Sequence, residues 1–119
     1  MTKTTAEPQQ GMRRHKLLPA DIRKKLPAIG TTDGQGMDAI AQVKFFCPTG
    51  RFTMYVTEFD GEDTLYGYTV SALGPDCDEW GYASFSELAE MTHPVFKRMP
   101  AIERDCYWDP RKVGEAVGS

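Results

Sequence analysis

The stretch from Arg51 to Val70, RFTMYVTEFDGEDTLYGYTV, decides the fold class of this chain of 119 residues. Between residues 51 and 59, apolar side chains alternate with polar or aromatic ones, a pattern that predicts a β-strand with one buried face. The segment 60–63, DGED, is typical of a turn because Asp and Gly favour turn geometry. Residues 64–73 alternate again, so we expect a second strand that runs antiparallel beside the first.

Further strands are expected on both sides of this hairpin. Residues 42–47 carry Val and Phe side chains and precede a turn at 48–50, which predicts a strand that pairs with the first. Alternation also predicts a strand over 80–83 and a last strand within 102–108. Because the first three strands have short links, we expect an antiparallel meander.

Short helices complete the expected fold. Residues 19–26 begin with a proline suited to a first helical turn and end before the next proline. Ser84 and Glu87 have the spacing of a capping box, so a helix should begin there. Asp109 before Pro110 is typical of an N-cap followed by proline at the first helical position. The sequence therefore predicts an α+β fold, an antiparallel meander sheet of about four to five strands with short helices packed on one side.

Charge divides the chain into two parts. Residues 1–16 hold four basic side chains and one acidic one, show no periodicity and are expected to form a disordered basic N-terminal arm. Residues 17–119, with 10 basic and 16 acidic side chains, are expected to form a single α+β domain. That domain has a net charge of −6, so it repels phosphate backbones and favours a basic partner.

The composition argues against several classes of protein. Three cysteines without C-x-x-C spacing argue against a disulfide framework, and two histidines far from any cysteine pair argue against zinc. No apolar run approaches the roughly 20 residues of a membrane span, and the N-terminus shows no secretory signal. The glycine-rich segment 30–36 has no lysine and joins no strand to a helix, unlike a phosphate-binding loop. We expect a cytoplasmic protein with no cofactor, no metal site and no catalytic residue.

Carboxylates gather in and after the hairpin, and we expect them to form a negatively charged surface that binds a partner. Tyr66 lies beside the acidic turn and is added as a contact anchor, because tyrosine is enriched at interfaces. The predicted partner-binding residues are Glu58, Asp60, Glu62, Asp63, Tyr66, Asp76, Asp78 and Glu79. Such a surface would compete for a groove that normally holds DNA or RNA.

Two other functions stay open. A metal-dependent phosphodiesterase-like enzyme would hold a divalent cation through carboxylate oxygens, provided that the fold brings the hairpin and the last strand together. Its ligands would be Glu58, Asp60, Glu103 and Asp105. A DNA-binding accessory protein would use a basic arm, whose few charges allow only a weak, salt-sensitive contact with nucleic acid. That arm would consist of Arg13, Arg14, Lys16 and Arg23–Lys25.

Several motifs together resemble the bacterial domain-of-unknown-function family 2958. The most specific is TEFDGEDT at 57–64, within a similar run from Tyr55 to Gly67. The others are LLP at 17–19, RKKLP at 23–27, VKFF at 43–46 with Pro48, EWGY at 79–82, SFSEL at 84–88 and IERD at 102–105. The resemblance spans about residues 17–112, nearly the whole expected domain.

This resemblance implies a context and no activity. Members of the family look like cargo of plasmids, conjugative elements and phages, often encoded beside anti-restriction genes, and they supply no catalytic residue to carry over. With the acidic domain, this leads us to expect a non-catalytic protein of a mobile genetic element in a bacterial host cytoplasm. It would inhibit or modulate a host nucleic-acid-processing or defence complex, as anti-CRISPR or anti-restriction proteins do. The expected partner is a host protein or ribonucleoprotein complex with a basic nucleic-acid-binding surface, and no membrane.

Overall fold

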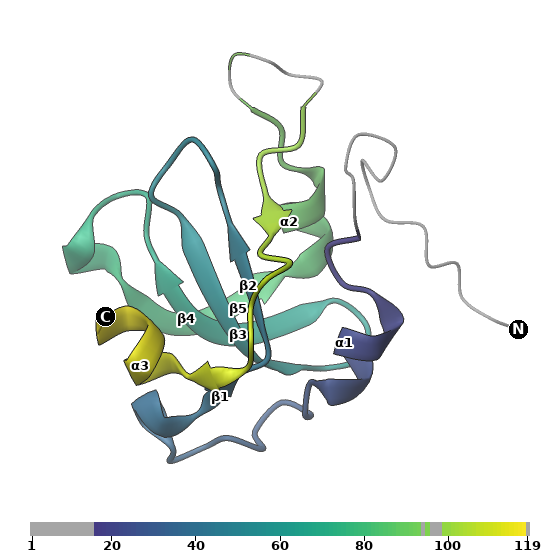
Figure 1. The fold of residues 1–119 in the computed structure, drawn as a ribbon, viewed down its shortest axis with the longest axis vertical. Coiled ribbons are helices and arrows are strands. Elements are labelled where there is room, and N and C mark those ends of the chain that lie inside the picture. Colours follow the sequence, from purple (N-terminus) through teal and green to yellow (C-terminus); the bar gives the residue numbers. More distant parts are fainter. Residues whose placement is uncertain (1–15, 94, 96–98, 119) are drawn as a thin grey trace, which may run out of the picture.

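A five-stranded antiparallel sheet forms the centre of the fold (Figure 1). The structure is a computed structural model, and it describes residues 16–93, 95 and 99–118. Neighbouring strands follow the order β5-β4-β3-β2-β6. Their bounds are β2 Val43–Phe46, β3 Thr53–Phe59, β4 Thr64–Val70, β5 Glu79–Ser84 and β6 Glu103–Arg104. Because β2 to β5 pair with their neighbours in sequence, the predicted α+β class and antiparallel meander are confirmed.

Short helices and a second, two-stranded sheet flank this central sheet. The α-helices are α1 Ala20–Lys25, α2 Phe85–Glu90 and α3 Val113–Gly118. Two 3₁₀ turns lie in the connections, η2 Gly36–Asp38 and η3 Pro75–Cys77. The small sheet joins β1 Ile40–Ala41 to β7 Arg111–Lys112 and so ties the C-terminal segment to the chain before β2. Among the described residues, no helix is long and apolar enough to cross a membrane.

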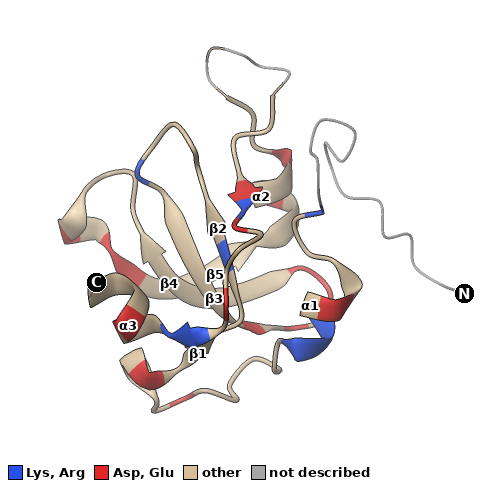
Figure 2. Cartoon of the chain, viewed as in Figure 1, with Lys and Arg blue, Asp and Glu red and all other residues tan. Residues whose placement is uncertain are grey.

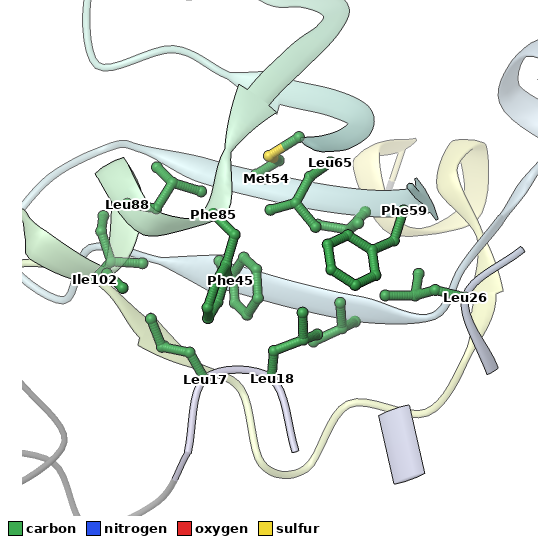
Figure 3. Packing of buried hydrophobic residues seen from close by; sticks show 13 residues of the cluster. Leu17, Leu18, Leu26, Phe45, Met54, Phe59, Leu65, Phe85, Leu88 and Ile102 are labelled. Atoms are coloured by element: carbon green, nitrogen blue, oxygen red, sulfur yellow. The ribbon is translucent and has the colours of Figure 1, made fainter. Parts of the chain in front are cut away.

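One face of the central sheet packs against the N-terminal segment, α1 and α2. Alternation along β2 and β3 places Val43, Phe45, Met54 and Val56 on this face, where each is at most 1% exposed. Side chains from α2, from the segments on either side of α1 and from the segment before β6 complete the cluster (Figure 3). The labelled members are Leu17, Leu18, Leu26, Phe45, Met54, Phe59, Leu65, Phe85, Leu88 and Ile102. Burial of these apolar groups is the main favourable contribution to folding.

The opposite face of the hairpin is buried as well, so the prediction of one buried face is wrong for β3. Tyr55 on that face is 8% exposed and packs with Ala41 and Val113. The Trp108 ring lies 5.6 Å from the Tyr55 ring, and its Nε1 donates to the Ala41 carbonyl at 2.9 Å. Helix α3 therefore covers this second face, whereas α1 and α2 lie together on the first. Polarity alternation missed this burial because Tyr and Trp bury large rings while their polar groups find partners.

A β-bulge changes which face the end of β3 presents. The pairing of β3 with β4 shifts between Val56 and Glu58, which leaves Thr57 as the extra residue. Strict alternation would place Glu58 on the face of Val56, inside the apolar cluster. The bulge instead turns Phe59 into that cluster and Glu58 to the aromatic face, opposite Tyr66.

The C-terminal segment departs from two predicted boundaries. The predicted last strand shortens to β6, which pairs with β2 over two residues. The chain then turns, with the Trp108 N–H donating to the Asp105 carbonyl at 3.2 Å. The helix predicted after Asp109 begins only at Val113, because the two residues of β7 first pair with β1. Asp109 therefore caps no helix.

The two earlier helices begin where the sequence predicts. Helix α1 starts directly after Pro19, which lacks an N–H group to satisfy. At the start of α2, the Ser84 hydroxyl oxygen accepts from the Glu87 N–H at 3.2 Å. The same hydroxyl donates to the Asp63 carboxylate at 2.6 Å, so the helix start is also joined to the β3–β4 turn.

Candidate partner-binding face

The eight predicted partner-binding residues do not lie together. Six of them lie at the two ends of β4, and about 20 Å of strand separates these ends. The turn between β3 and β4 carries Asp60, Glu62 and Asp63, while η3 and the chain that enters β5 carry Asp76, Asp78 and Glu79. Glu58 and Tyr66 lie between the two ends as directly opposed residues of β3 and β4.

Two carboxylates of the β3–β4 turn, those of Asp60 and Asp63, hold the fold together. Asp60 Oδ1 accepts from three backbone N–H groups of the turn at 2.8, 2.9 and 3.0 Å, and these bonds lower the pKa of Asp60. Asp63 accepts from the Ser84 hydroxyl and from the Ser86 N–H and hydroxyl at 2.6, 2.8 and 3.0 Å. Burial opposes ionisation of Asp63, but these hydrogen bonds outweigh it and lower its pKa. Both acids are charged at neutral pH, and both already have donors inside the protein.

At the other end of β4, Asp78 is also engaged. Both of its oxygens accept from the Arg51 guanidinium at 2.8 Å, and Oδ1 accepts from the Ser71 N–H at 2.7 Å. The hydrogen bond from Arg51 is the main cause of the lowered pKa of Asp78. Asp76 and Glu79 are exposed and remain accessible to a partner.

Glu58 is buried at 1% exposure, so its place is beneath the surface and not on it. Its carboxylate accepts from the Gly30 N–H at 2.8 Å, from the Thr32 N–H at 2.5 Å and from the Thr32 hydroxyl. Burial raises the pKa of Glu58, but the hydrogen bonds from Thr32 and Gly30 together outweigh burial and hold the pKa below its ordinary value. Gly30 has φ +96°, a conformation that glycine adopts without strain. Glu58 thus fixes the 30–36 loop against the aromatic face of the sheet.

That loop forms one wall of a pocket of about 340 Å³ over β4 and β5. The pocket is lined by Thr32, Asp33, Gly34, Gly36, Ala39, Tyr66 and Trp80. The rings of Tyr66 and Trp80 stack at 18° with centroids 5.7 Å apart. Tyr82, which is 67% exposed, extends this group with its centroid 4.9 Å from Tyr66. Of the eight predicted residues, Tyr66 is the one that lines the pocket.

Sequence reasoning missed Asp33 and Trp80 as site residues. The alternation in EWGY and in TLYGY does place Trp80, Tyr82 and Tyr66 on one face of neighbouring strands, so the sequence pattern could have predicted the aromatic wall. No sequence pattern predicts the position of the loop over these rings, because that position depends on hydrogen bonds to Glu58 from a distant part of the chain.

The four carboxylates of the alternative enzyme do not converge. Glu103 and Asp105 lie beside β2 near the start of β3, whereas Asp60 follows its far end. Asp105 forms an ion pair with Lys44 at 3.8 Å. In the part of the chain that the structure describes, no group of three or more His, Cys, Asp or Glu side chains could hold a metal ion.

The basic residues of the alternative DNA-binding arm are only partly described. Arg13 and Arg14 lie outside the described residues. Lys16 is exposed, and its carbonyl accepts from Arg104 Nε at 2.8 Å. Arg23 serves the fold, with its guanidinium carbon 5.3 Å from the centroid of the Phe59 ring.

The comparisons with known proteins identify a family. A family model described as "Protein of unknown function (DUF2958)" matches residues 17–113. The matched segment contains the whole five-stranded sheet and every residue that lines the pocket. No curated protein and no solved structure matches the chain.

Proposed function

We propose a binding function for this chain, which belongs to the DUF2958 family of proteins of unknown function. In this proposal, the chain is a non-catalytic protein of a mobile genetic element in the cytoplasm of a bacterial host. It binds a host nucleic-acid-processing or defence complex through that complex's basic surface and inhibits or modulates it, as an anti-CRISPR or anti-restriction protein does.

The observation that carries this proposal is the sign of the charge at the pocket. Among the described residues that line it, Asp33 alone is charged. The pKa of the Tyr66 hydroxyl is raised, first by burial, then by Tyr82 and by the acids Glu58 and Asp33. A pocket with a carboxylate and aromatic rings attracts cationic groups and repels phosphates.

The exposed acids Asp76 and Glu79 extend the same field, whereas Asp38 on η2 is paired with Lys112 at 3.7 Å. Figure 2 shows acidic residues on η2, on η3, at the start of β5 and on α3, and further acids on α1 and α2; basic residues lie on α1 and on β7, which is next to α3. The pocket lies between η2 and β5, which contribute Gly36 and Trp80 to its lining. A surface of this kind speeds encounter with a positively charged partner, and salt weakens that effect.

The test is retention of host proteins on the immobilised full-length chain at two salt concentrations. We expect a partner that binds at low salt and is released when the salt concentration rises, because exposed charges are screened within about 10 Å at 0.1 M salt. The double variant Asp76→Asn/Glu79→Gln should retain less of it.

The matched control is Asp21→Asn/Glu87→Gln, which removes the same charge from α1 and α2 on the other side of the sheet. It should retain as much partner as the unmodified chain. Absence of any retained protein at low salt, or equal loss in both double variants, contradicts the proposed function.

A further inference from the structure

The pocket has an aromatic wall that faces a polar loop. Tyr66 and Trp80 form the aromatic wall, and their rings stack on each other at 18°. The loop is anchored from below, since Glu58 accepts from the N–H groups of Gly30 and Thr32. The volume of about 340 Å³ lies at the lower end of the range for ligand sites, roughly 300–1,000 Å³. It suits a single side chain better than a large cofactor.

Asp33 brings a carboxylate to the polar side of this pocket. Its backbone is fixed, because its N–H donates to the Gly30 carbonyl at 3.2 Å. Within residues 16–93, 95 and 99–118, no group donates a hydrogen bond to the Asp33 carboxylate, and no cation pairs with it. This sets Asp33 apart from Asp60, Asp63 and Asp78, which all have internal donors.

The aromatic wall lacks a cation as well. The faces of Trp and Tyr rings attract cations, and this chain uses that attraction at Trp108, where the Arg111 guanidinium carbon lies 4.4 Å from the ring centroid. Among the described side chains, no arginine or lysine lies over Trp80 or Tyr66. The pocket therefore has the two components of a guanidinium site, aromatic rings and a carboxylate.

An arginine side chain matches these components better than the alternatives. Its guanidinium is planar, stacks on aromatic faces and donates two parallel hydrogen bonds to a carboxylate. A lysine ammonium is compact and strongly hydrated, so it gains less from a flat ring. A nucleobase would stack equally well, but Asp33 and Glu58 repel the phosphates that nucleotides carry.

We infer that this pocket receives an arginine side chain from the basic surface of the partner. The guanidinium packs against the rings of Tyr66 and Trp80 and donates to Asp33. The inference rests on the proposed function, because it names the group through which the partner is recognised. Arginines that otherwise hold nucleic-acid phosphates are the groups that such a pocket sequesters.

The test is a titration of the ¹⁵N-labelled full-length chain with a short peptide that has one arginine and blocked ends. The chain has two tryptophans, so its spectrum has one indole N–H signal from Trp80 in the pocket and one from Trp108 outside it. We expect the Trp80 signal and the 32–36 amides to shift with a dissociation constant in the millimolar range, while the Trp108 signal stays. A peptide with citrulline, which has the shape of arginine without its charge, should bind about tenfold more weakly.

Two variants that remove one charge each locate the site. Asp33→Asn should weaken arginine binding about tenfold, since it replaces a charge-assisted hydrogen bond by a neutral one. Asp76→Asn removes a charge outside the pocket lining and should change binding by about twofold or less. An unchanged Trp108 signal shows that each variant is folded. Equal binding of the two peptides, an unchanged affinity of Asp33→Asn, or a Trp80 shift with a nucleoside monophosphate alone overturns the inference.

Retention of the host partner separates this inference from the proposed function. If the unmodified chain and Asp33→Asn retain the partner equally, the arginine pocket is refuted and the proposed function stands. If the arginine peptide binds the pocket but no partner is retained at low salt, the pocket stands and the proposed function fails.

Discussion

The β3–β4 turn and the 30–36 loop place their acids in opposite situations. The turn has the denser run of carboxylates, but Asp60 and Asp63 accept hydrogen bonds from the turn and from the start of α2. The loop supplies one carboxylate to the pocket, Asp33, and no described group donates to it. The availability of an acid for a partner therefore depends on its existing donors more than on how many acids surround it.

Glu58 connects the two regions. Its backbone belongs to β3 just before the turn, while its carboxylate holds the loop through Gly30 and Thr32. Substitutions at the bulge that directs Glu58, at Glu58 itself, in the turn and at an exposed acid should therefore lower stability by successively smaller amounts.

The largest effect is expected from one methyl group at Gly67, which faces the bulge of β3. A Cβ atom there would lie 2.1 Å from the Tyr55 carbonyl oxygen and 2.9 Å from Val56 Cα, closer than real contacts. The backbone must shift, so we expect Gly67→Ala to lower the free energy of unfolding by about 4 kcal/mol or more. Chemical denaturation measures this loss.

The control is Gly81→Ala on the neighbouring strand. Gly81 is the cross-strand partner of Gly67, but a Cβ atom there meets nothing within 4 Å. Its free energy of unfolding should change by about 1 kcal/mol or less. Similar losses in the two variants would mean that the bulge tolerates the methyl group.

The second effect is expected from Glu58→Gln, which keeps the side-chain shape. One oxygen becomes an NH₂ group that cannot accept from the loop, so buried donors lose their partner and stability falls by about 3 kcal/mol at neutral pH. Because the folded pKa of Glu58 is below its ordinary value of about 4.3, its contribution is complete above that value and is lost as the pH falls through the folded pKa. The difference between the two chains should therefore narrow in acid, as denaturation curves at about pH 7 and pH 3 would show.

Glu79→Gln serves as the control for charge alone. Glu79 is exposed at the start of β5, so this variant should alter stability by about 0.5 kcal/mol or less. A Glu58→Gln variant that is no less stable than this control would show that the loop does not depend on Glu58.

A smaller effect is expected in the turn. Asp63→Ala removes the acceptor for Ser84 and Ser86 at the start of α2, so we expect a loss of about 1–2 kcal/mol, moderated by the partial exposure of the site. Thermal unfolding of this variant beside Asp76→Ala, which loses an exposed acid, measures the difference. Equal midpoints for the two variants would contradict the structural role of Asp63.

The smallest effect is expected for an exposed ion pair. Asp38 lies 3.7 Å from Lys112, with side chains 79% and 50% exposed. Asp38→Asn should change the free energy of unfolding by about 0.5 kcal/mol or less, and added salt should remove even that difference. A loss above about 1 kcal/mol would show that this acid is structural, like those of the turn.

The local pattern predicts the strands and the cap well. Period-two alternation places Tyr66 and Tyr68 on one side of β4, and the Ser84–Glu87 spacing predicts the start of α2. Each of these features depends on neighbours within a few residues, which a sequence shows directly. The C-terminal segment is predicted less well, because Asp109 caps no helix once β7 pairs with β1, more than 60 residues earlier in the chain.

The candidate site is predicted only in part, because some of its residues are placed by contacts between distant segments. Tyr66 is predicted as a contact residue, and it lines the pocket. Glu58 is predicted beside it on the surface, but the bulge and the loop bury it. Asp33 lies in a segment whose composition indicates only a loop.

The sequence by itself determined the α+β class, the meander, the start of α2 and the acidic surplus of the domain, because these follow from composition and from short-range spacing. Only the tertiary structure decided which carboxylates face solvent. That decision rests on hydrogen bonds between distant segments, such as those of Glu58 with Gly30 and Thr32, and a single extra residue in β3 directs Glu58 toward them. Side-chain direction reverses with each residue along a strand, so one bulge turns Glu58 from the core face of the sheet to the face that carries the pocket.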